Sequence, residues 1–339
     1  MMCNFFNFFP VGQGLFYYGS LNFGEFTFAY DCGTITHEVD LSNHISKVVK
    51  LNGGNKLDFL AISHFHWDHV SGVEQLENLV GFKHVYLPYL SSNSTIRNFV
   101  IGIQLFEDTQ EFDERRLSTY RFLINLYNRD NRNLEPGSGY IPHPNWVFKY
   151  FNKEIKPKLC ELLLEKIEKL LIKYSVTNVI DLFKVGKFKE LREAYLEVFK
   201  NSELNDTSLL LLHYPEINNH FYETRYYPND CGTIINEGTH HHFYPYTLLT
   251  GDILFDDNLA KDVINSYPTG VSGIVQVPHH GSKYNWSSLI NRFPSFNCYV
   301  VNYGTTNKFG HPDYLLRTHV PSHKFFDNNE FKGFLYQII

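Results

Sequence analysis

The chain has 339 residues, of which 43% are hydrophobic and 17% aromatic, so it can bury the sizeable core of an α/β or sandwich domain that carries an insertion. Its formal net charge of −6 argues against a protein that coats nucleic acid through a general basic excess. A local basic channel would not show in this count, and neither would the charge of bound metal ions.

Cysteine usage and hydropathy bear on the compartment. The five cysteines are scattered and contain no C-x-x-C pair, which is typical of reduced, structural thiols: Cys3, Cys32, Cys160, Cys231 and Cys298. Residues 1–9 are apolar but lack the basic start of a signal peptide, so they predict a first strand. No apolar stretch reaches the roughly 18 residues that a membrane span needs. We therefore expect a cytoplasmic protein without a membrane partner.

The first part of the chain, to about residue 88, consists of strands and turns. Residues 14–20 and 25–31 predict a hairpin, residues 39–51 a helix with one apolar face, and residues 56–63 and 84–87 two further strands. Strand, helix and strand in this order are typical of one half of an α/β sandwich.

A cluster of histidines follows the strand predicted at residues 56–63. His64, His66, Asp68 and His69 lie in the run His-Phe-His-Trp-Asp-His. Alternate side chains at a strand end point to the same side, so His64 and His66 can reach one metal ion, while Asp68 and His69 can face a second. Imidazole and carboxylate without thiolate suit zinc, manganese or iron. With 17 histidines in the chain, a histidine-rich surface loop is the alternative, but ligand residues directly after a buried strand favour a metal site.

Residues 91–201 differ in character, because helical patterns dominate there. Leucine and isoleucine recur at spacings of three and four in residues 158–174 and 187–200, with charged residues between them. We predict a mainly helical insertion, residues 91–201, in a core formed by residues 1–90 and 202–339. Both junctions should lie beside the histidine cluster, so the insertion is expected to select the substrate or to dock a protein partner. Its aromatic residues could stack on bases or fill the insertion's own core: Phe99, Phe106, Tyr120, Tyr127, Trp146 and Tyr150.

The second half returns to strands and supplies more candidate ligands. Strands are predicted at residues 208–213, 246–250, 274–277 and 298–302, and helices at 256–266 and 286–292. Asp252 follows one strand in a Thr-Gly-Asp turn, His279 and His280 follow the next, and His311 lies in a glycine-containing loop after the last. Binding sites of α/β proteins gather at such carboxyl ends of strands. The histidine run 240–242 reads instead as an exposed loop.

Together these motifs resemble the metallo-β-lactamase fold superfamily, and more narrowly the soluble hydrolase domain of the ComEC/Rec2 competence proteins. The resemblance is carried by Pro-Val-Gly-Gln-Gly at 10–14, Tyr-Asp-Cys-Gly-Thr at 30–34, the cluster at 64–69, Asn-Asp-Thr-Ser-Leu at 205–209, Thr-Gly-Asp at 250–252, the segment 277–282 and the loop 304–312. It implies a four-layer αββα metallo-β-lactamase sandwich of the α/β class, with the helical insertion outside the match.

The resemblance also implies a centre with two divalent metal ions, zinc first and manganese as the alternative. His64 and His66 would hold one ion, Asp68, His69 and His280 the other, with Asp252 bridging and Asp31 orienting ligands. His279 and His311 would be general acids near the leaving group or further ligands.

The sequence departs from the superfamily at one ligand position. Many members have a histidine where this chain has residues 205–208, so Asn205 and Asp206 are the candidates to replace it. Competence proteins also span membranes, which this sequence does not predict, so a transport role is not implied.

The predicted reaction is metal-dependent phosphodiester hydrolysis of DNA or RNA. Two metal ions about 3.5–4 Å apart polarise a phosphoryl oxygen and activate a water for in-line attack, with Asp68 among the residues that shape the reaction centre. Cyclic or modified nucleotides are the alternative substrates. In a different class of function, the chain would be a metal-binding scaffold or sensor that docks a partner protein through its insertion.

Overall fold

The structure is a computed structural model that describes residues 4–107, 109, 113–129, 136–153, 155–199, 207–216, 224–228, 246–267, 273–292, 296 and 298–339. Asn205 and Asp206, the candidate replacements for a ligand histidine, lie outside the described residues, as does the histidine run 240–242.

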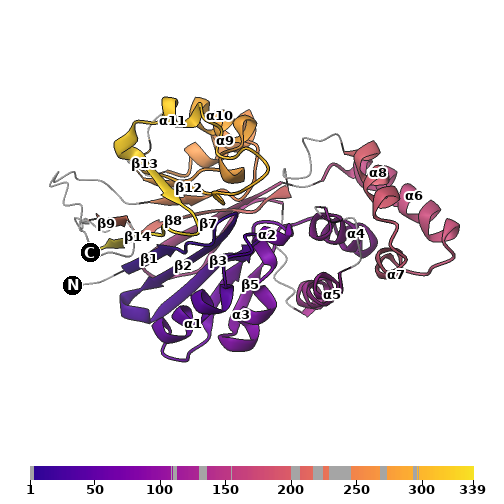
Figure 1. The fold of residues 1–339 in the computed structure, drawn as a ribbon, viewed down its shortest axis with the longest axis horizontal. Coiled ribbons are helices and arrows are strands. Elements are labelled where there is room, and N and C mark those ends of the chain that lie inside the picture. Colours follow the sequence, from indigo (N-terminus) through magenta and orange to yellow (C-terminus); the bar gives the residue numbers. More distant parts are fainter. Residues whose placement is uncertain are drawn as a thin grey trace.

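Two seven-stranded mixed sheets pack face to face (Figure 1). The first sheet has the order β5-β4-β3-β2-β1-β14-β9 and the second the order β13-β12-β11-β10-β8-β7-β6. The first sheet consists of β1 (Asn4–Phe8), β2 (Gly14–Leu21), β3 (Phe26–Thr34), β4 (Leu57–Ala61), β5 (Phe82–Tyr86), β9 (Thr224–Pro228) and β14 (Phe334–Ile338). The second consists of β6 (Gly137–Ile141), β7 (Trp146–Asn152), β8 (Leu210–Pro215), β10 (Thr247–Leu249), β11 (Ile274–Gln276), β12 (Cys298–Asn302) and β13 (Phe325–Asn328).

Aromatic side chains fill the space between the sheets. The ring of Phe28 stacks on Phe59 at 5.0 Å and meets Phe148 of the opposite sheet edge-on at 4.9 Å. Alternate residues of each strand point inward, as the burial of β1 shows, so each sheet contributes one face to this layer. The many phenylalanines and tyrosines of the composition are therefore largely core residues.

Helices cover both outer faces and complete the four layers, which confirms the predicted αββα sandwich. The first sheet is covered by α1 (Leu41–Leu51), α2 (Trp67–Val70) and α3 (Val73–Leu79), and the second by α9 (Asp257–Ile264), α10 (Lys283–Arg292) and α11 (Leu316–His319). The helix α1 begins where the Asp40 carboxylate accepts a hydrogen bond from the Ser42 amide, and it buries Leu41, Ile45 and Val48.

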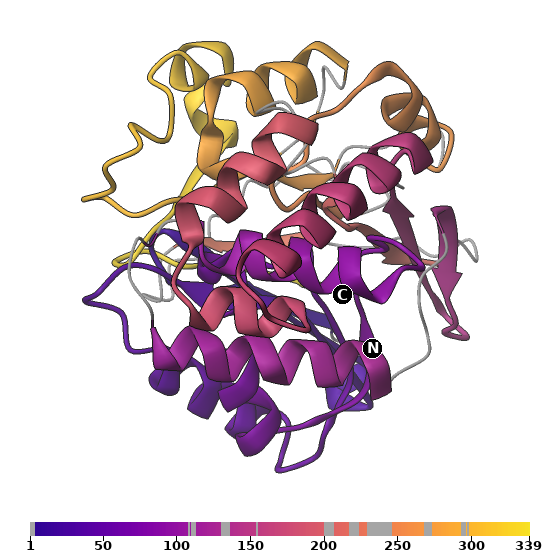
Figure 2. The same cartoon turned by 90° about the vertical axis from the view of Figure 1, so that its right-hand side faces the viewer.

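The described part of the region 91–201 contains five helices beside the sandwich, which lie in front of both sheets in Figure 2. They are α4 (Ser94–Leu105), α5 (Glu114–Arg129), α6 (Pro157–Lys173), α7 (Val179–Lys184) and α8 (Phe188–Val198). The region is not helical throughout, however. Between α5 and α6, strands β6 and β7 form a hairpin that pairs with β8 and so extends the second sheet. The short alternation of Trp146, Phe148 and Tyr150 is a strand pattern that lies between longer helical ones.

The aromatic residues of this region pack inside the protein. Phe99, Tyr120 and Tyr127 are at most 3% exposed, and they belong to one continuous hydrophobic cluster with the helices on the first sheet. Trp146 is buried between the two sheets. Stacking on bases is thus wrong for these four residues, and filling the core is the correct alternative. Among the described residues, no helix has the length and apolar character needed to cross a bilayer.

A buried histidine in the core makes the stability of the fold depend on pH. His213 of β8 accepts a hydrogen bond from the Trp146 indole at Nδ1, and its Nε2 lies 2.8 Å from the Tyr17 hydroxyl. Burial lowers its pKa to about 3, well below the roughly 6.5 of an unfolded histidine. The unfolded chain therefore binds this proton first, and stability present above pH 6.5 is lost as the pH falls toward 3.

We expect His213→Gln to flatten this pH dependence. Between pH 6.5 and 4.5 the slope of the free energy of unfolding should decrease by up to about 1.4 kcal/mol per pH unit, the contribution of one proton. Urea denaturation of both proteins across this range measures the slope, which is independent of any constant loss of stability in the variant. Parallel curves would show that His213 does not control the acid sensitivity of the core.

Candidate metal centre

The candidate ligands meet at one edge of the sandwich. Strands β3, β4 and β5 run parallel to one another, and so do β10, β11, β12 and β13. His64, Asp252, His280 and His311 all follow the carboxyl ends of such strands. The fold thereby gathers residues from both halves of the chain, as predicted from their positions at strand ends.

Glycines allow the segments of the centre to approach one another closely. A Cβ atom on Gly33 would lie 2.6 Å from the carbonyl oxygen of Asp68, so only glycine lets α2 pack on β3. Gly251 has φ +54°, and a Cβ there would lie 2.7 Å from the Cβ of Ser63. The Gly-Asp turn thus brings Asp252 against the histidine cluster.

Two groups of three side chains have the geometry of metal ligands. The first group is His64, His66 and Asp252, and the second is Asp68, His69 and His280. Within each group, one ligand atom of every residue lies within 4.8 Å of the others.

Asp252 connects the two groups. One of its oxygens, Oδ2, lies 3.5 Å from His64 Nε2, and the other, Oδ1, lies 3.4 Å from His69 Nε2. A carboxylate that presents one oxygen to each group has the arrangement of a bridging ligand. The bridging role itself remains a prediction.

Hydrogen bonds hold two histidines in the tautomer that binds metal. The buried Asp31 carboxylate accepts bonds from the Ser63 amide and hydroxyl, both at 2.6 Å, and from His69 Nδ1 at 2.8 Å. Because the Ser63 proton points to Asp31, its oxygen accepts from His64 Nδ1 at 2.8 Å. Both rings therefore carry their proton on Nδ1 and direct the Nε2 lone pair into the centre.

His280 is oriented in the same way from the other sheet. Its Nδ1 donates to the backbone oxygen of Asn302 at 2.9 Å, and its Nε2 faces Asp68 Oδ2, also at 2.9 Å. A neutral imidazole nitrogen and a carboxylate oxygen both accept hydrogen bonds, so a proton or a cation must lie between them.

The residues present fit a divalent cation. Nε2 of His64 and of His69 and Oδ1 of Asp252 are buried and have no hydrogen-bond partner. Leaving such atoms unsatisfied costs about 1–3 kcal/mol each, and a metal ion would satisfy all three. Burial would lower the pKa of His69, but the carboxylates of Asp68, Asp252 and Asp31 outweigh it and raise the pKa. These three carboxylates around one imidazole favour a bound positive charge.

His279 and His311 lie beside the two groups without belonging to either. Their rings are 5.5 Å apart, and His279 Nε2 is 3.8 Å from Asp252 Oδ2. Burial lowers the pKa of both, that of His311 to about 4, so both imidazoles are neutral at pH 7. Both residues line the pocket beside the two ligand groups.

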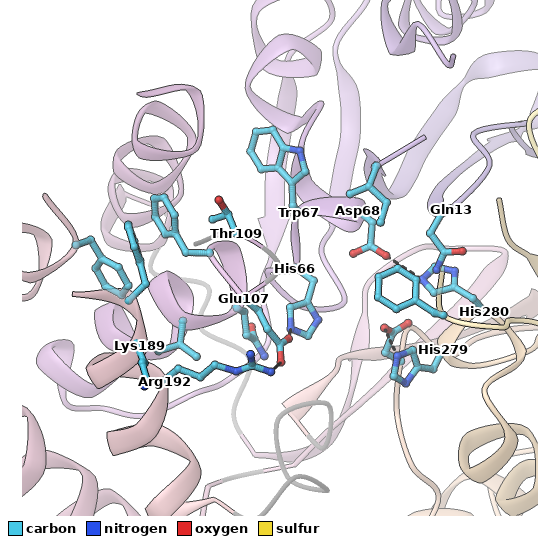
Figure 3. A pocket seen from close by; sticks show the side chains of 18 of the residues that line it. Gln13, His66, Trp67, Asp68, Glu107, Thr109, Lys189, Arg192, His279 and His280 are labelled. Carbon is cyan, nitrogen blue, oxygen red and sulfur yellow. Dashed lines mark hydrogen bonds and ion pairs between the residues drawn. The ribbon is translucent and has the colours of Figure 1, made fainter. Parts of the chain in front are cut away.

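A pocket of about 860 Å³ opens over the centre, between the core and the helices of the region 91–201 (Figure 3). Its core wall includes His66, Asp68, Asp252, His279, His280 and His311, and its opposite wall includes Phe106, Glu107, Phe183, Lys187, Phe188, Lys189 and Arg192. Glu107, Lys187, Lys189 and Arg192 carry no sequence signal of a site, because charged residues in or next to an amphipathic helix resemble an ordinary solvated face.

Similarity to known proteins extends to folds alone. No protein-family model matches the sequence, and no curated protein matches it either. Among solved structures, the chain is similar to the metallo-β-lactamase fold protein YhfI from Bacillus subtilis, with 10% identity, a TM-score of 0.45 and 99% of each chain covered. It is also similar to the metallo-β-lactamase GOB-18 from Elizabethkingia meningoseptica, with 8% identity, a TM-score of 0.34 and 84% and 82% covered. At these values the function must be inferred from the site itself.

Asp31→Asn should weaken metal binding without removing a ligand. An amide accepts hydrogen bonds at only one of its two terminal atoms, so His64 or His69 would lose its fixed tautomer. We expect an affinity loss of about 10–100-fold, as for other residues that orient metal ligands, measured by competition with a chromogenic chelator.

The matched control is Asp58→Asn, on β4. The Asp58 carboxylate accepts from the Thr27 amide and pairs with Lys83, and it does not line the pocket over the centre. It should keep the wild-type affinity. An Asp31→Asn protein that binds metal as tightly as this control would show that the tautomers do not depend on Asp31.

Proposed function

We propose that the protein is a dinuclear-metal-dependent hydrolase that cleaves phosphodiester bonds in nucleic acids or nucleotides. The proposal depends chiefly on Asp252, which faces one ligand group with each oxygen at the base of a large pocket. Two bound divalent ions would supply Lewis-acid polarisation of a phosphoryl oxygen and activation of water. Asp252 would set the spacing of the two positions.

The wall opposite the ligand groups supports an anionic substrate. Lys187, Lys189 and Arg192 line it, and Figure 3 shows Lys189 and Arg192 across the pocket from His279 and His280. A guanidinium group can bind two phosphate oxygens at once, and an ammonium group adds a point charge. A neutral lactam or ester would make no use of these cations. With three cations against the two carboxylates of Glu107 and Glu190, the lining of this wall favours a phosphorylated substrate despite the acidic chain.

The size of the pocket limits what reaches the centre. A volume of about 860 Å³ is within the roughly 300–1,000 Å³ of small-molecule sites. It accommodates a nucleotide or the end of a strand more readily than the middle of a duplex. Cyclic and modified nucleotides thus remain the second class of substrate, next to single-stranded DNA or RNA.

His279 and His311 would act on the substrate from the core wall. His279 lies beside Asp252, His311 packs against His279, and their neutral rings can donate N–H hydrogen bonds to an oxygen of the substrate. We assign them the orientation of the leaving oxygen. Delivery of a proton would require the bound phosphate to raise the pKa of one ring.

The test measures whether the metal-loaded protein hydrolyses bis(p-nitrophenyl) phosphate, cyclic nucleotides, single-stranded DNA or RNA. We expect activity that a chelator abolishes and that added zinc or manganese restores. A protein that binds two ions but cleaves no phosphodiester would favour the metal-binding scaffold or sensor instead.

Asp252→Asn should reduce this activity by about 100-fold or more, since displacement of reacting groups by about 1 Å costs that much. The control is Asp256→Asn, four residues further along. Asparagine keeps the oxygen that caps α9, and the pair with Lys153 is half-exposed, so the variant should lose less than about 1 kcal/mol of stability and keep its activity. Equal turnover by Asp252→Asn and wild type, measured at saturating metal, would contradict the bridging role.

A further inference from the structure

The two ligand groups of the proposed centre are unequal. The second group has three residues of its own, Asp68, His69 and His280, besides Asp252. Among the residues that the structure describes, the first group has His64 and His66 besides Asp252. The segment that would supply another histidine in the superfamily, residues 205–208, contains none.

A carboxylate from outside the core lies at this incomplete group. Glu107, just after α4, has its Oε2 2.6 Å from His66 Nε2 (Figure 3). The contact matches the one in the second group, where Asp68 Oδ2 lies 2.9 Å from His280 Nε2. In the second pair Nδ1 of His280 is already the donor, so two acceptors face each other there. Nε2 of His66 is buried and has no hydrogen-bond partner despite the short distance to Glu107, and a cation between the two atoms would satisfy both.

We propose that Glu107 is a ligand of the first metal position. This inference rests on the proposed dinuclear centre. It gives both positions the same set of groups: two imidazoles, one terminal carboxylate and the shared Asp252. His64 belongs to this first position, and its Nε2 is fully buried and has no hydrogen-bond partner.

Two contacts hold Glu107 in place. The side-chain oxygen of Gln104 accepts a hydrogen bond from the Phe65 amide at 3.1 Å, which fixes the end of α4 against the histidine cluster. Arg192 of α8 lies 3.7 Å from Glu107 Oε1 and thereby orients Oε2 toward His66. Glu107 is thus held between α8 and the core, and metal binding would fasten the helices of the region 91–201 to the sandwich.

The additional carboxylate bears on the choice of metal. Manganese prefers carboxylate oxygens as ligands, whereas zinc and iron also bind well to imidazole nitrogens. A first position with two carboxylates should therefore accept manganese more readily than the histidine-rich position that the superfamily motif implies.

The experiment measures bound metal in the full chain. Wild type and Glu107→Gln are equilibrated with buffered zinc and, separately, manganese, and the ions per chain are counted by mass spectrometry. We expect wild type to bind two ions. In Glu107→Gln the affinity for one ion should fall by more than about 100-fold, which is the upper end of the losses seen when a residue that only orients a ligand is changed. The affinity for the other ion should stay unchanged. Glu107→His, which retains a ligand atom, should recover part of the loss.

The matched control is Glu190→Gln. Glu190 lines the same pocket from α8, but its carboxylate accepts from the Tyr174 hydroxyl, so both ions should be retained. Asp206→Asn tests Asp206, which is the acidic one of the two candidates from residues 205–208 for the missing ligand. Circular dichroism confirms that each variant is folded.

Three outcomes would overturn the inference: two ions bound by Glu107→Gln with wild-type affinities, equal weakening of both ions, or loss of one ion in Asp206→Asn but not in Glu107→Gln. In each of these cases a wild type with two ions and phosphodiesterase activity leaves the proposed function standing. A wild type that never binds two ions contradicts both.

Discussion

The buried carboxylate of Asp31 is the constraint around which the candidate centre is built. It has a left-handed φ of 56° within β3 and accepts three hydrogen bonds, from the amide and hydroxyl of Ser63 and from His69. An isolated buried charge would be costly, so these donors are needed to keep it there. In return the carboxylate joins β3, the segment after β4 and α2, and it helps to direct the lone pairs of two histidines, one from each ligand group, into the centre.

The remaining ligand candidates depend on how the two sheets face each other. Asp252 and His280 come from the second sheet, and they reach the histidine cluster of the first because the parallel strands of both sheets end at the same edge. Asp252 is then the point of contact between the halves, with one oxygen near His64 and the other near His69. The site therefore exists only when both halves of the chain are folded together.

The proposed catalytic and substrate-binding roles belong to different parts of the fold. The sandwich supplies the groups that would carry out the chemistry, while the helices of the region 91–201 supply a basic wall and close the pocket. These helices share one hydrophobic cluster with the layer over the first sheet, so they are part of the folded body. The contact between Glu107 and His66 links these helices directly to the ligand groups. A change in how the helices pack would therefore alter both substrate specificity and metal binding.

The sequence by itself determined the histidine cluster, the Gly-Asp turn and the strand-end histidines, since each depends on spacing within a few residues. The sandwich class followed from the family resemblance that these motifs carry. The sequence did not reveal the hairpin β6–β7, whose place in the second sheet depends on pairing with β8 about 60 residues further along the chain. Nor did it reveal Glu107, which has no motif around it. Only the tertiary structure decided which surface charge of a helical segment faces the centre, because that depends on how α4 and α8 pack against the sandwich.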